Sequence, residues 1–467
     1  MESGKREKFS KIGFVLAAAG SAVGLGNIWK FPTLAGQNGG GIFLIFYLVF
    51  IVLMGVPLIL GEASMGRYAQ LGPTGAYQKI ASECGKKGLA LKFWTVIGAL
   101  GSFANLIVLM YYSVIAGWVL QYCIRVFDTP IQTMDMDLFG EITSQPVVPI
   151  IFALIIIWLT VMVDMKGIAA GVERVSKILM PLLFIMLIFC AIFSMTLDGA
   201  MEGVKYMWVP SLENAENVGG LGHVALAALG QCFFSLSLGC GMMITFGSFV
   251  SKKSSLPKQV YGIPILDTVV ALLAGFVTLP AVFAVASQTG IDPTSQTGPG
   301  MLMYALPQSL YAAFGSGLGT VLTFVMLLLV VFAAFTSTVA ILQATVSHLI
   351  EYMHMDKKKA YILCGIVVSI GSIICSLSNG SVLSGLTIGG MCIQDAADWF
   401  VSNLLMPIGA FFMCIFVGYI WKMDNSIKEI TNDGSDKFTW AGLFKVCIMV
   451  IDPIIILIVF LSGIGVF

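Results

Sequence analysis

Apolar segments long enough to cross a membrane follow one another along almost the whole chain. Their approximate residue ranges are 12–35, 41–65, 92–124, 147–165, 175–196, 222–249, 260–286, 317–352, 360–378, 384–421 and 443–466. A membrane helix needs about 20 mostly apolar residues, and a composition with 58% hydrophobic and 11% charged residues excludes a soluble domain. The sequence therefore predicts an all-α polytopic membrane protein with eleven transmembrane helices in a lipid bilayer.

Lysine and arginine residues gather in the loops on one side of these segments. The basic stretches are 5–11, 79–92, 166–177, 252–258, 357–359 and 422–445. Because loops rich in these residues stay in the cytoplasm, we expect a multi-pass protein of the cell (plasma) membrane with a cytoplasmic N-terminus. The odd number of spans then places the C-terminus outside the cell.

The first apolar segment is interrupted near its middle. Gly20, Gly24 and Gly26 each weaken a helix by about 1 kcal/mol relative to alanine, and Asn27 follows them. Backbone groups freed inside hydrocarbon need partners in a protein-buried cavity. The freed carbonyls and the side-chain oxygen of Asn27 are hard ligands suited to an alkali cation. The alternative is a glycine-rich face for close helix packing.

The sixth segment is interrupted at a corresponding depth, in the sequence FFSLSLGCG. It combines an aromatic side chain, two hydroxyls and two helix breakers, at Phe234, Ser235, Ser237, Gly239 and Gly241. A single membrane serine commonly bonds back to its own helix. Two broken spans five segments apart instead indicate an inverted repeat with a binding site at the membrane midplane.

This repeat predicts how the chain is organised. The expected parts are a cytoplasmic tail (1–11), a first repeat of spans 1–5 (12–196), an extracellular linker (197–221), a second repeat of spans 6–10 (222–421), and a loop with span 11 (422–467). Within the second repeat, residues 287–316 are rich in turn residues and too long for a simple connection. We expect them to form an extracellular lid.

Three further places carry polar groups inside apolar segments. Tyr111 and Tyr112 form a pair that packing or a membrane boundary also explains. Thr336 and Ser337 offer neighbouring hydroxyls, for which helix capping is the alternative. Asp267 is an ionisable group in the seventh segment, and such residues cost about 2.5–3.5 kcal/mol at mid-bilayer and are functional by default.

Together these motifs resemble the neurotransmitter:sodium symporters, and specifically their bacterial amino-acid transporters. The matching stretches are GSAVGLGNIWKFP, NGGGIFLIFY, VPLILGEASMGRY, the tyrosine pair, GQCFFSLSLGCG and FAAFTSTVA. The resemblance covers essentially the whole chain. It implies the LeuT-type fold, a 5+5 inverted repeat with spans 1 and 6 unwound at mid-membrane. It also implies alternating access around a central amino-acid site and two sodium ions as the cofactors.

The resemblance also implies the residues of each site. The first sodium site would contain Ala22, Asn27, Ser235 and Asp267. The second would contain Gly20, Val23, Ala333, Thr336 and Ser337. The substrate would contact Ala22, Leu25, Gly26, Val108, Tyr112, Phe234, Ser235, Ser237, Cys240 and Ile341. In this arrangement the half-helix N-terminus faces the substrate carboxylate and unwound carbonyls face cations.

The two gates depart from the family pattern. The outer gate, commonly an Arg–Asp pair, would consist of Lys30 and Asp398. Lysine cannot make the bidentate fork of arginine, so we expect a looser gate; the alternative is that both side chains extend to the lipid headgroups. The inner gate would consist of Arg6, Phe9 and Glu351, with phenylalanine in place of the usual tryptophan.

A third departure concerns chloride, which animal members of the family bind near the first sodium ion. Tyr47, Gln231 and Ser235 stand at matching positions, but the usual Asn is Asp267 and a later Ser is Ala271. A fixed carboxylate supplies the negative charge that chloride otherwise brings. We therefore expect Asp267 to substitute for chloride; the alternative is a protonated, desolvated carboxyl.

These features predict a sodium-coupled symporter that imports a hydrophobic or aromatic amino acid without chloride. A gated cation channel is the first alternative, but no repeated filter sequence is present. A non-transporting amino-acid sensor is the second, although no signalling domain is recognisable. An enzyme is not expected, because His223, His348 and His354 form no metal-ligand or triad pattern. The expected partners are the amino acid, sodium and lipid, with no nucleic acid.

Overall fold

The structure of the protein is a computed structural model that describes residues 8–134, 136–289, 303 and 306–466. Within these residues the regular elements are helices, including short π-helical and 3-10 turns labelled η. The first group is α1 (Lys11–Ala22), η1 (Gly26–Lys30), α2 (Phe31–Gln37), α3 (Gly41–Phe50), η2 (Ile51–Gly55), α4 (Val56–Ala69), α5 (Pro73–Glu83), α6 (Gly88–Arg125), η3 (Ile131–Thr133), α7 (Met136–Ser144), α8 (Val148–Asp164), η4 (Ile168–Glu173) and α9 (Arg174–Met195).

The second group includes the expected linker (197–221), which is itself helical. It is α10 (Ala200–Trp208), α11 (Leu212–Asn217), α12 (Gly220–Ser235), α13 (Met242–Ser248), α14 (Leu256–Val260), α15 (Gly262–Thr289), α16 (Leu306–Ser347), η6 (His348–Tyr352) and α17 (Lys357–Ser378). It continues with α18 (Ile393–Phe400), η7 (Val401–Leu405), α19 (Met406–Ile415), η8 (Phe416–Ile420), α20 (Met423–Ile430), α21 (Ala441–Val446), η9 (Cys447–Ile451) and α22 (Asp452–Gly463).

The predicted membrane-spanning architecture is confirmed. Among the described residues, 8 helices are long and apolar enough to cross a membrane, and the number rises to 10 if each of two bent pairs is one span. One bent pair is α1 with η1 and α2, at 54°. The short apolar helix α12 is followed by α13 after a break, as expected for the interrupted sixth span. These helices are consistent with the eleven predicted spans.

Two predicted boundaries differ from the structure. In the expected lid, 287–316, α15 continues to Thr289 and α16 already begins at Leu306, while residues 290–302 and 304–305 lie outside the described residues. Buried Leu306 and Leu310 give the start of α16 an apolar face, and Gly315, with φ +72°, then turns the chain. The tenth span starts near Ile393 rather than 384, because a turn with Gly389 and Gly390 at positive φ precedes it.

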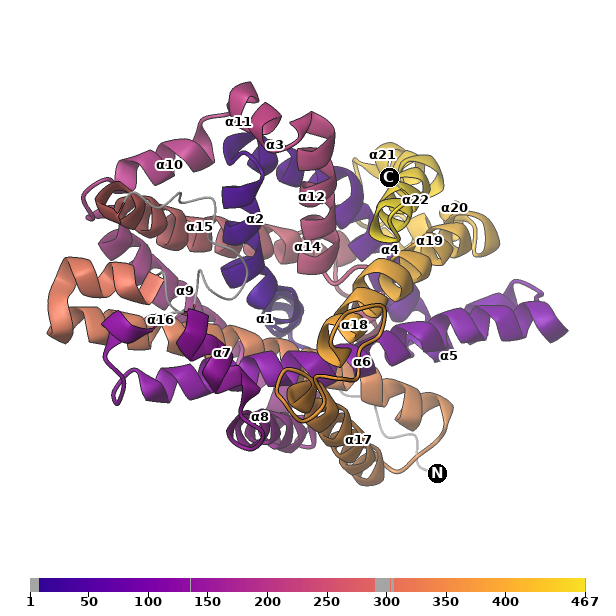
Figure 1. Cartoon of the computed structure of the whole chain (residues 1–467). Helices are drawn as coiled ribbons and strands as arrows, with labels where there is room; N and C mark the ends of the chain where they lie inside the picture. Colours follow the sequence, from indigo (N-terminus) through magenta and orange to yellow (C-terminus); the bar gives the residue numbers. More distant parts are fainter. Residues whose placement is uncertain (1–7, 135, 290–302, 304–305, 467) are drawn as a thin grey trace.

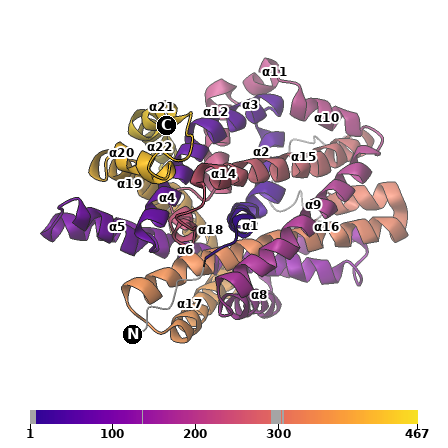
Figure 2. The same ribbon diagram turned by 180° about the vertical axis from the view of Figure 1, so that it is seen from behind.

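The broken first span lies at the centre of the bundle. Figures 1 and 2 show α1 and α2 in the middle, with α6, α12, α15 and α16 around them. α1 packs on α16, α15 and α9, and α13 packs on α4. Two large apolar cores flank this centre. Polar groups at the two breaks are therefore held away from lipid, as an interrupted membrane helix requires.

Candidate functional site

The break in the first span lies between α1 and η1. Helix α1 ends where Val23 becomes extended, with φ −71° and ψ 103°. The Gly24 N–H then donates to the side-chain oxygen of Asn27 at 3.1 Å. A Cβ at Gly24 would lie 2.6 Å from both the Ser337 and the Tyr112 hydroxyl oxygens. Glycine is therefore required here because three membrane spans meet at this point.

The break in the sixth span lies between α12 and α13. Ser237, Gly239 and Gly241 have φ values of +50°, +82° and +69°. Glycine adopts such values without steric cost, which explains two of the three positions. A Cβ at Gly239 would also collide with the carbonyl oxygen of Met406 in α19. The broken segment thus touches α19 through its backbone.

Of the four residues predicted for the first sodium site, Asn27 and Ser235 meet at Asp267 of α15, whereas Ala22 lines the central cavity described below. The Asp267 carboxylate accepts hydrogen bonds from Asn27 Nδ2 at 2.7 Å and from Ser235 Oγ at 3.0 and 3.1 Å. Tyr47 donates to the same carboxylate at 3.2 Å. All four side chains are buried. The side-chain oxygen of Asn27, the expected ligand, instead accepts from Gly24, so an ion here would require the amide of Asn27 to rotate.

The residues predicted for the second sodium site meet between α1 and α16. Ser337 Oγ lies 3.4 Å from the Gly20 carbonyl oxygen, 3.3 Å from that of Val23 and 3.2 Å from that of Ala333. The Thr336 hydroxyl donates to the Ala333 carbonyl at 3.0 Å. Carbonyl and hydroxyl oxygens are the ligands that hard cations prefer. The donor set therefore fits an alkali cation.

A central cavity of about 50 Å³ lies between the two breaks. The predicted substrate residues that line it are Ala22, Gly26, Val108, Tyr112, Phe234, Ser237, Cys240 and Ile341. Six further lining residues were not predicted from the sequence, and Ser337, predicted only for sodium, lines the cavity as well. The six are Ser21, Gly24, Asn105, Tyr111, Met242 and Met406. Met242 follows a glycine in the broken segment and so could have been found, whereas Met406 lies outside every motif.

Two predicted substrate residues do not line this cavity. The Ser235 side chain faces Asp267. Leu25 lines a second, outer pocket, and its N–H donates to the Tyr112 hydroxyl at 3.1 Å. The Leu25 amide, at the half-helix N-terminus that we expect to face a substrate carboxylate, is therefore bonded to a phenol that lines the central cavity.

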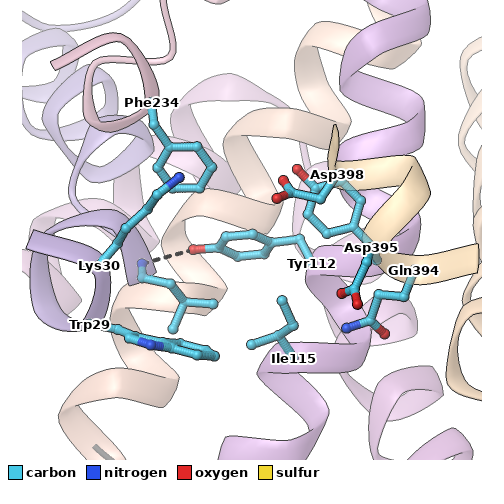
Figure 3. A pocket seen from close by; sticks show the side chains of 10 residues that line it. Trp29, Lys30, Tyr112, Ile115, Phe234, Gln394, Asp395 and Asp398 are labelled. Carbon is cyan, nitrogen blue, oxygen red and sulfur yellow. Dashed lines mark hydrogen bonds between the residues drawn. The ribbon is translucent and has the colours of Figure 1, made fainter. Parts of the chain in front are cut away.

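The outer pocket has a volume of about 230 Å³ and shares Phe234, Tyr111 and Tyr112 with the central cavity. Figure 3 shows Lys30 and Asp398 on opposite sides of it. The Lys30 ammonium lies 3.9 Å from the centre of the Phe234 ring. Among the described residues, the ion pairs within 4 Å are Arg67–Glu429 and Lys177–Glu173. Lys30 and Asp398 thus share the pocket without the direct contact of a closed gate.

The predicted inner gate is described in part. Arg6 lies outside the described residues. Phe9 is buried against the rings of Phe14, Phe246 and Phe249 at centroid distances of 6.1, 5.7 and 6.0 Å. Glu351 accepts a hydrogen bond from the Gly72 N–H. Phe9 therefore anchors the N-terminal segment on α13, the second half of the broken sixth span.

The residues matched to the chloride site donate hydrogen bonds to two different acceptors. Tyr47 and Ser235 donate to the Asp267 carboxylate. Gln231 instead donates to the Gly26 carbonyl at 2.7 Å and so supports the broken first span. Ala271 is buried and offers no hydroxyl. The Asp267 carboxylate therefore lies where two of the matched residues, Tyr47 and Ser235, converge.

A model of the sodium:neurotransmitter symporter family matches residues 6–136 and 131–467 of the sequence. The chain belongs to this family. Its function is therefore transport rather than catalysis, and its helices form a multi-pass membrane protein. As a member of a sodium symporter family it uses sodium.

Individual relatives agree with this assignment. The chain is 36% identical to an uncharacterized sodium-dependent transporter, YhdH, of Bacillus subtilis over 98% of this chain and 97% of that protein. It is 26% identical to the rat sodium- and chloride-dependent taurine transporter over 90% of this chain and 72% of the relative. Among solved structures, MhsT in complex with L-phenylalanine is 36% identical, with a TM-score of 0.85 over 98% of this chain and 100% of that one. The LeuT-type fold expected from the sequence is confirmed.

Proposed function

We propose that this symporter imports a hydrophobic or aromatic amino acid by alternating access, with two sodium ions and without chloride. The observation that carries the proposal is a cavity between two broken spans, with one oxygen-rich cluster at its lining residue Ser337 and a second at Asp267. The similarity to a transporter solved with L-phenylalanine supports the substrate class. A midplane site between repeats is the arrangement that secondary transporters use.

The chemistry of the cavity supports this substrate class. Val108, Ile341 and Met406 offer apolar surface for a side chain. Gly26 and Tyr112 lie where the half-helix N-terminus meets the cavity, so they suit the amino acid's carboxylate. Cys240 is small and leaves room for an aromatic ring.

The two oxygen clusters would hold the coupling ions. One sodium ion moving down about 100 mV gains about 2.3 kcal/mol, and a tenfold gradient adds about 1.4 kcal/mol. Together these terms support roughly 500-fold accumulation of substrate per coupled ion. Sodium binding at the first cluster would be compensated by the Asp267 carboxylate, which replaces chloride.

The gates would act on the two sides of this site. Lys30 and Asp398 line the outer pocket, and closure would bring them together above Phe234. Phe9, with Arg6 and Glu351, would close the cytoplasmic side. We place the N-terminus and the basic loops in the cytoplasm, which makes the outer pocket extracellular.

Counterflow of L-phenylalanine in proteoliposomes tests this proposal. Vesicles loaded with unlabelled amino acid and sodium should transiently accumulate labelled amino acid from outside, because an alternating site exchanges one substrate for another. A channel would only equilibrate the label. Sodium-dependent binding without any counterflow would instead favour a non-transporting sensor and overturn the proposal.

A further inference from the structure

The central cavity is too small for an aromatic amino acid. Even with the small Cys240 side chain on its wall, its volume is about 50 Å³. That space corresponds to about four water molecules, since one water needs about 10–15 Å³. Phenylalanine has far more heavy atoms than that. Binding of an aromatic amino acid therefore requires part of the cavity wall to give way.

A second space shares a wall with the central cavity. This side pocket, of about 210 Å³, is lined by residues of η1, α2, α12, α18, η7, α19 and α22. Two residues, Phe234 of α12 and Met406 of α19, line both the side pocket and the central cavity. Their side chains are therefore the partition between the two spaces.

The two side chains of this partition differ in their freedom to move. The Lys30 ammonium lies 3.9 Å from the centre of the Phe234 ring (Figure 3), and this cation–π contact holds the ring. Met406 is unbranched, with three rotatable bonds and a thioether that adapts to irregular spaces. Rotation of Met406 into the side pocket would join the two spaces without moving a helix.

The backbone around Met406 is fixed against the broken sixth span. The Met406 N–H donates to the Val401 carbonyl across the π-helical turn η7, and Pro407 follows in the first turn of α19. Turns of this kind are frequent at functional sites. The Met406 carbonyl oxygen lies where a Cβ at Gly239 would collide with it. The side chain of Met406 is thus the part of this residue that can move.

An unpaired acceptor on the side pocket indicates what enters it. Gln231 lines the pocket and is 0% exposed. Its Nε2 donates to the Gly26 carbonyl at 2.7 Å, but its Oε1 has no hydrogen-bond partner among the described residues. A buried acceptor without a donor is unfavourable, so a ligand that brings an N–H or O–H is favoured here.

The rest of the side pocket suits an aromatic ring. Leu34, Leu226 and Val459 give it apolar surface. A ring with a donor at its edge, as in tryptophan or tyrosine, matches this surface and the Gln231 oxygen together. Phenylalanine fits the same space but offers no donor.

We propose that Met406 is a specificity-determining residue: its rotation joins the side pocket to the central cavity and admits the ring of tryptophan or tyrosine, whose donor bonds to Gln231. This inference rests on the proposed amino-acid site and names its substrate class. Smaller apolar side chains stay within the central cavity and need no rotation. Lys30 and Asp398 also line the side pocket, so closure of the outer gate would enclose the ring.

The first test is Met406→Ile in the full-length protein in detergent and saturating sodium. Isoleucine is branched at Cβ and holds one preferred rotamer in a helix, so it keeps the partition closed. Affinity for L-tryptophan should fall about tenfold, and affinity for L-leucine should change by less than about twofold. Met406→Ala, which removes the partition, should instead favour tryptophan over leucine more than the wild type does; this variant decides alone if Met406→Ile does not fold.

The matched control is Met413→Ile. Met413 is buried on the same helix and lines neither space. It should leave both affinities unchanged. An equal loss of tryptophan and leucine binding in Met406→Ile would show general support of the fold and overturn the inference, and so would an unchanged preference in Met406→Ala.

A ligand analogue tests the bond to Gln231. Benzothienylalanine has the shape of tryptophan with sulfur in place of the ring N–H. It should bind the wild type about tenfold more weakly than tryptophan. Equal affinity would contradict the role of the Gln231 oxygen.

A readout without an amino acid separates this inference from the proposed function. In protein with isotope-labelled methionine methyl groups, the Met406 signal is identified by its absence from Met406→Ala. Free indole should shift this signal, and sodium alone should not. If the wild type binds no amino acid but indole shifts the Met406 signal, the proposed function fails and the side pocket stands. A Met406 signal that responds to neither indole nor tryptophan overturns the inference.

Discussion

Cys240 is the side chain whose size should matter most for specificity. It lines the central cavity and its thiol donates to the Ser237 carbonyl at 3.0 Å. We predict that Cys240→Phe shifts preference toward smaller amino acids by about 1–3 kcal/mol, measured by competition against labelled substrate. Cys240→Ala, which only removes volume, should keep the preference for large side chains. An unchanged ranking in Cys240→Phe would remove Cys240 from the substrate site.

The hydroxyls of Thr336 and Ser337 should hold the second sodium ion. Replacing both with alanine removes two ligands from the cluster around Gly20 and Val23. We predict that substrate uptake loses its wild-type dependence on sodium concentration. Thr338→Ala is the matched control, because Thr338 bonds to Thr160 and the Phe335 carbonyl instead. Wild-type sodium dependence in the double variant would contradict the assignment.

Asp267 should make transport independent of chloride. Its carboxylate lies where Tyr47, Ser235 and Asn27 converge. We predict that wild-type uptake is unchanged when gluconate replaces chloride. Asp267→Asn should lose activity, and chloride should restore part of it, more so with Ala271→Ser. A collapse of wild-type uptake in gluconate would show that Asp267 is not the substitute charge.

At the scale of single residues, site residues that lie in recognisable motifs were predicted from the sequence. Residues whose partners lie far away in the sequence were not. The carbonyl oxygens around Ser337, which we expect to bind sodium, follow from a glycine-rich break and paired hydroxyls. The buried Glu62 of α4 lies within a matched motif, but its partners, the N–H groups of Gly239 and Met243, are 177 and 181 residues away. A contact between a side chain and the backbone of a distant segment leaves no pattern of residue types from which it could be predicted. The orientation of the Asn27 amide is likewise set by neighbours on other spans.

At the scale of elements, hydropathy located the spans but not their ends. The start of α16 was predicted as loop because its glycines and prolines are typical of turns, yet its leucines are buried and form a helix. The same helix contains Gly315, whose φ of +72° and ψ of −174° only glycine adopts readily. Tertiary packing determines where such helices begin and end, and this packing cannot be predicted from a single sequence.

The turn at Gly315 inside α16 can be tested directly. We predict that Gly315→Ala lowers the free energy of unfolding by about 1–3 kcal/mol, measured by thermal unfolding in detergent. A Cβ at Gly315 meets nothing within 4 Å, so the loss comes from the backbone alone. Gly317→Ala is the control, since that site is equally open and has no positive φ. Equal stability of the two variants would mean that no turn exists at 315.

At the scale of the whole molecule, the inverted repeat explains why two oxygen-rich clusters and a cavity lie close to the two breaks. Each broken span contributes polar backbone, and the intact spans around it contribute Asp267, Ser337 and Glu62. The fold follows from two interruptions at corresponding depths, which the sequence shows without any structure. The proposed outer gate is the part of this arrangement that depends on one substitution, a lysine where the family commonly has arginine, and we expect it to be loose for that reason.

Sodium-driven accumulation of amino acid is the most direct test of the proposed sodium-coupled symport. Proteoliposomes containing potassium gluconate are diluted into sodium gluconate with labelled L-phenylalanine. We predict that the internal label rises above the external concentration, without chloride, and that it stays at equilibrium when potassium replaces the external sodium. An internal label that never exceeds the external concentration, or that rises equally without sodium, would contradict a sodium-coupled amino-acid symporter.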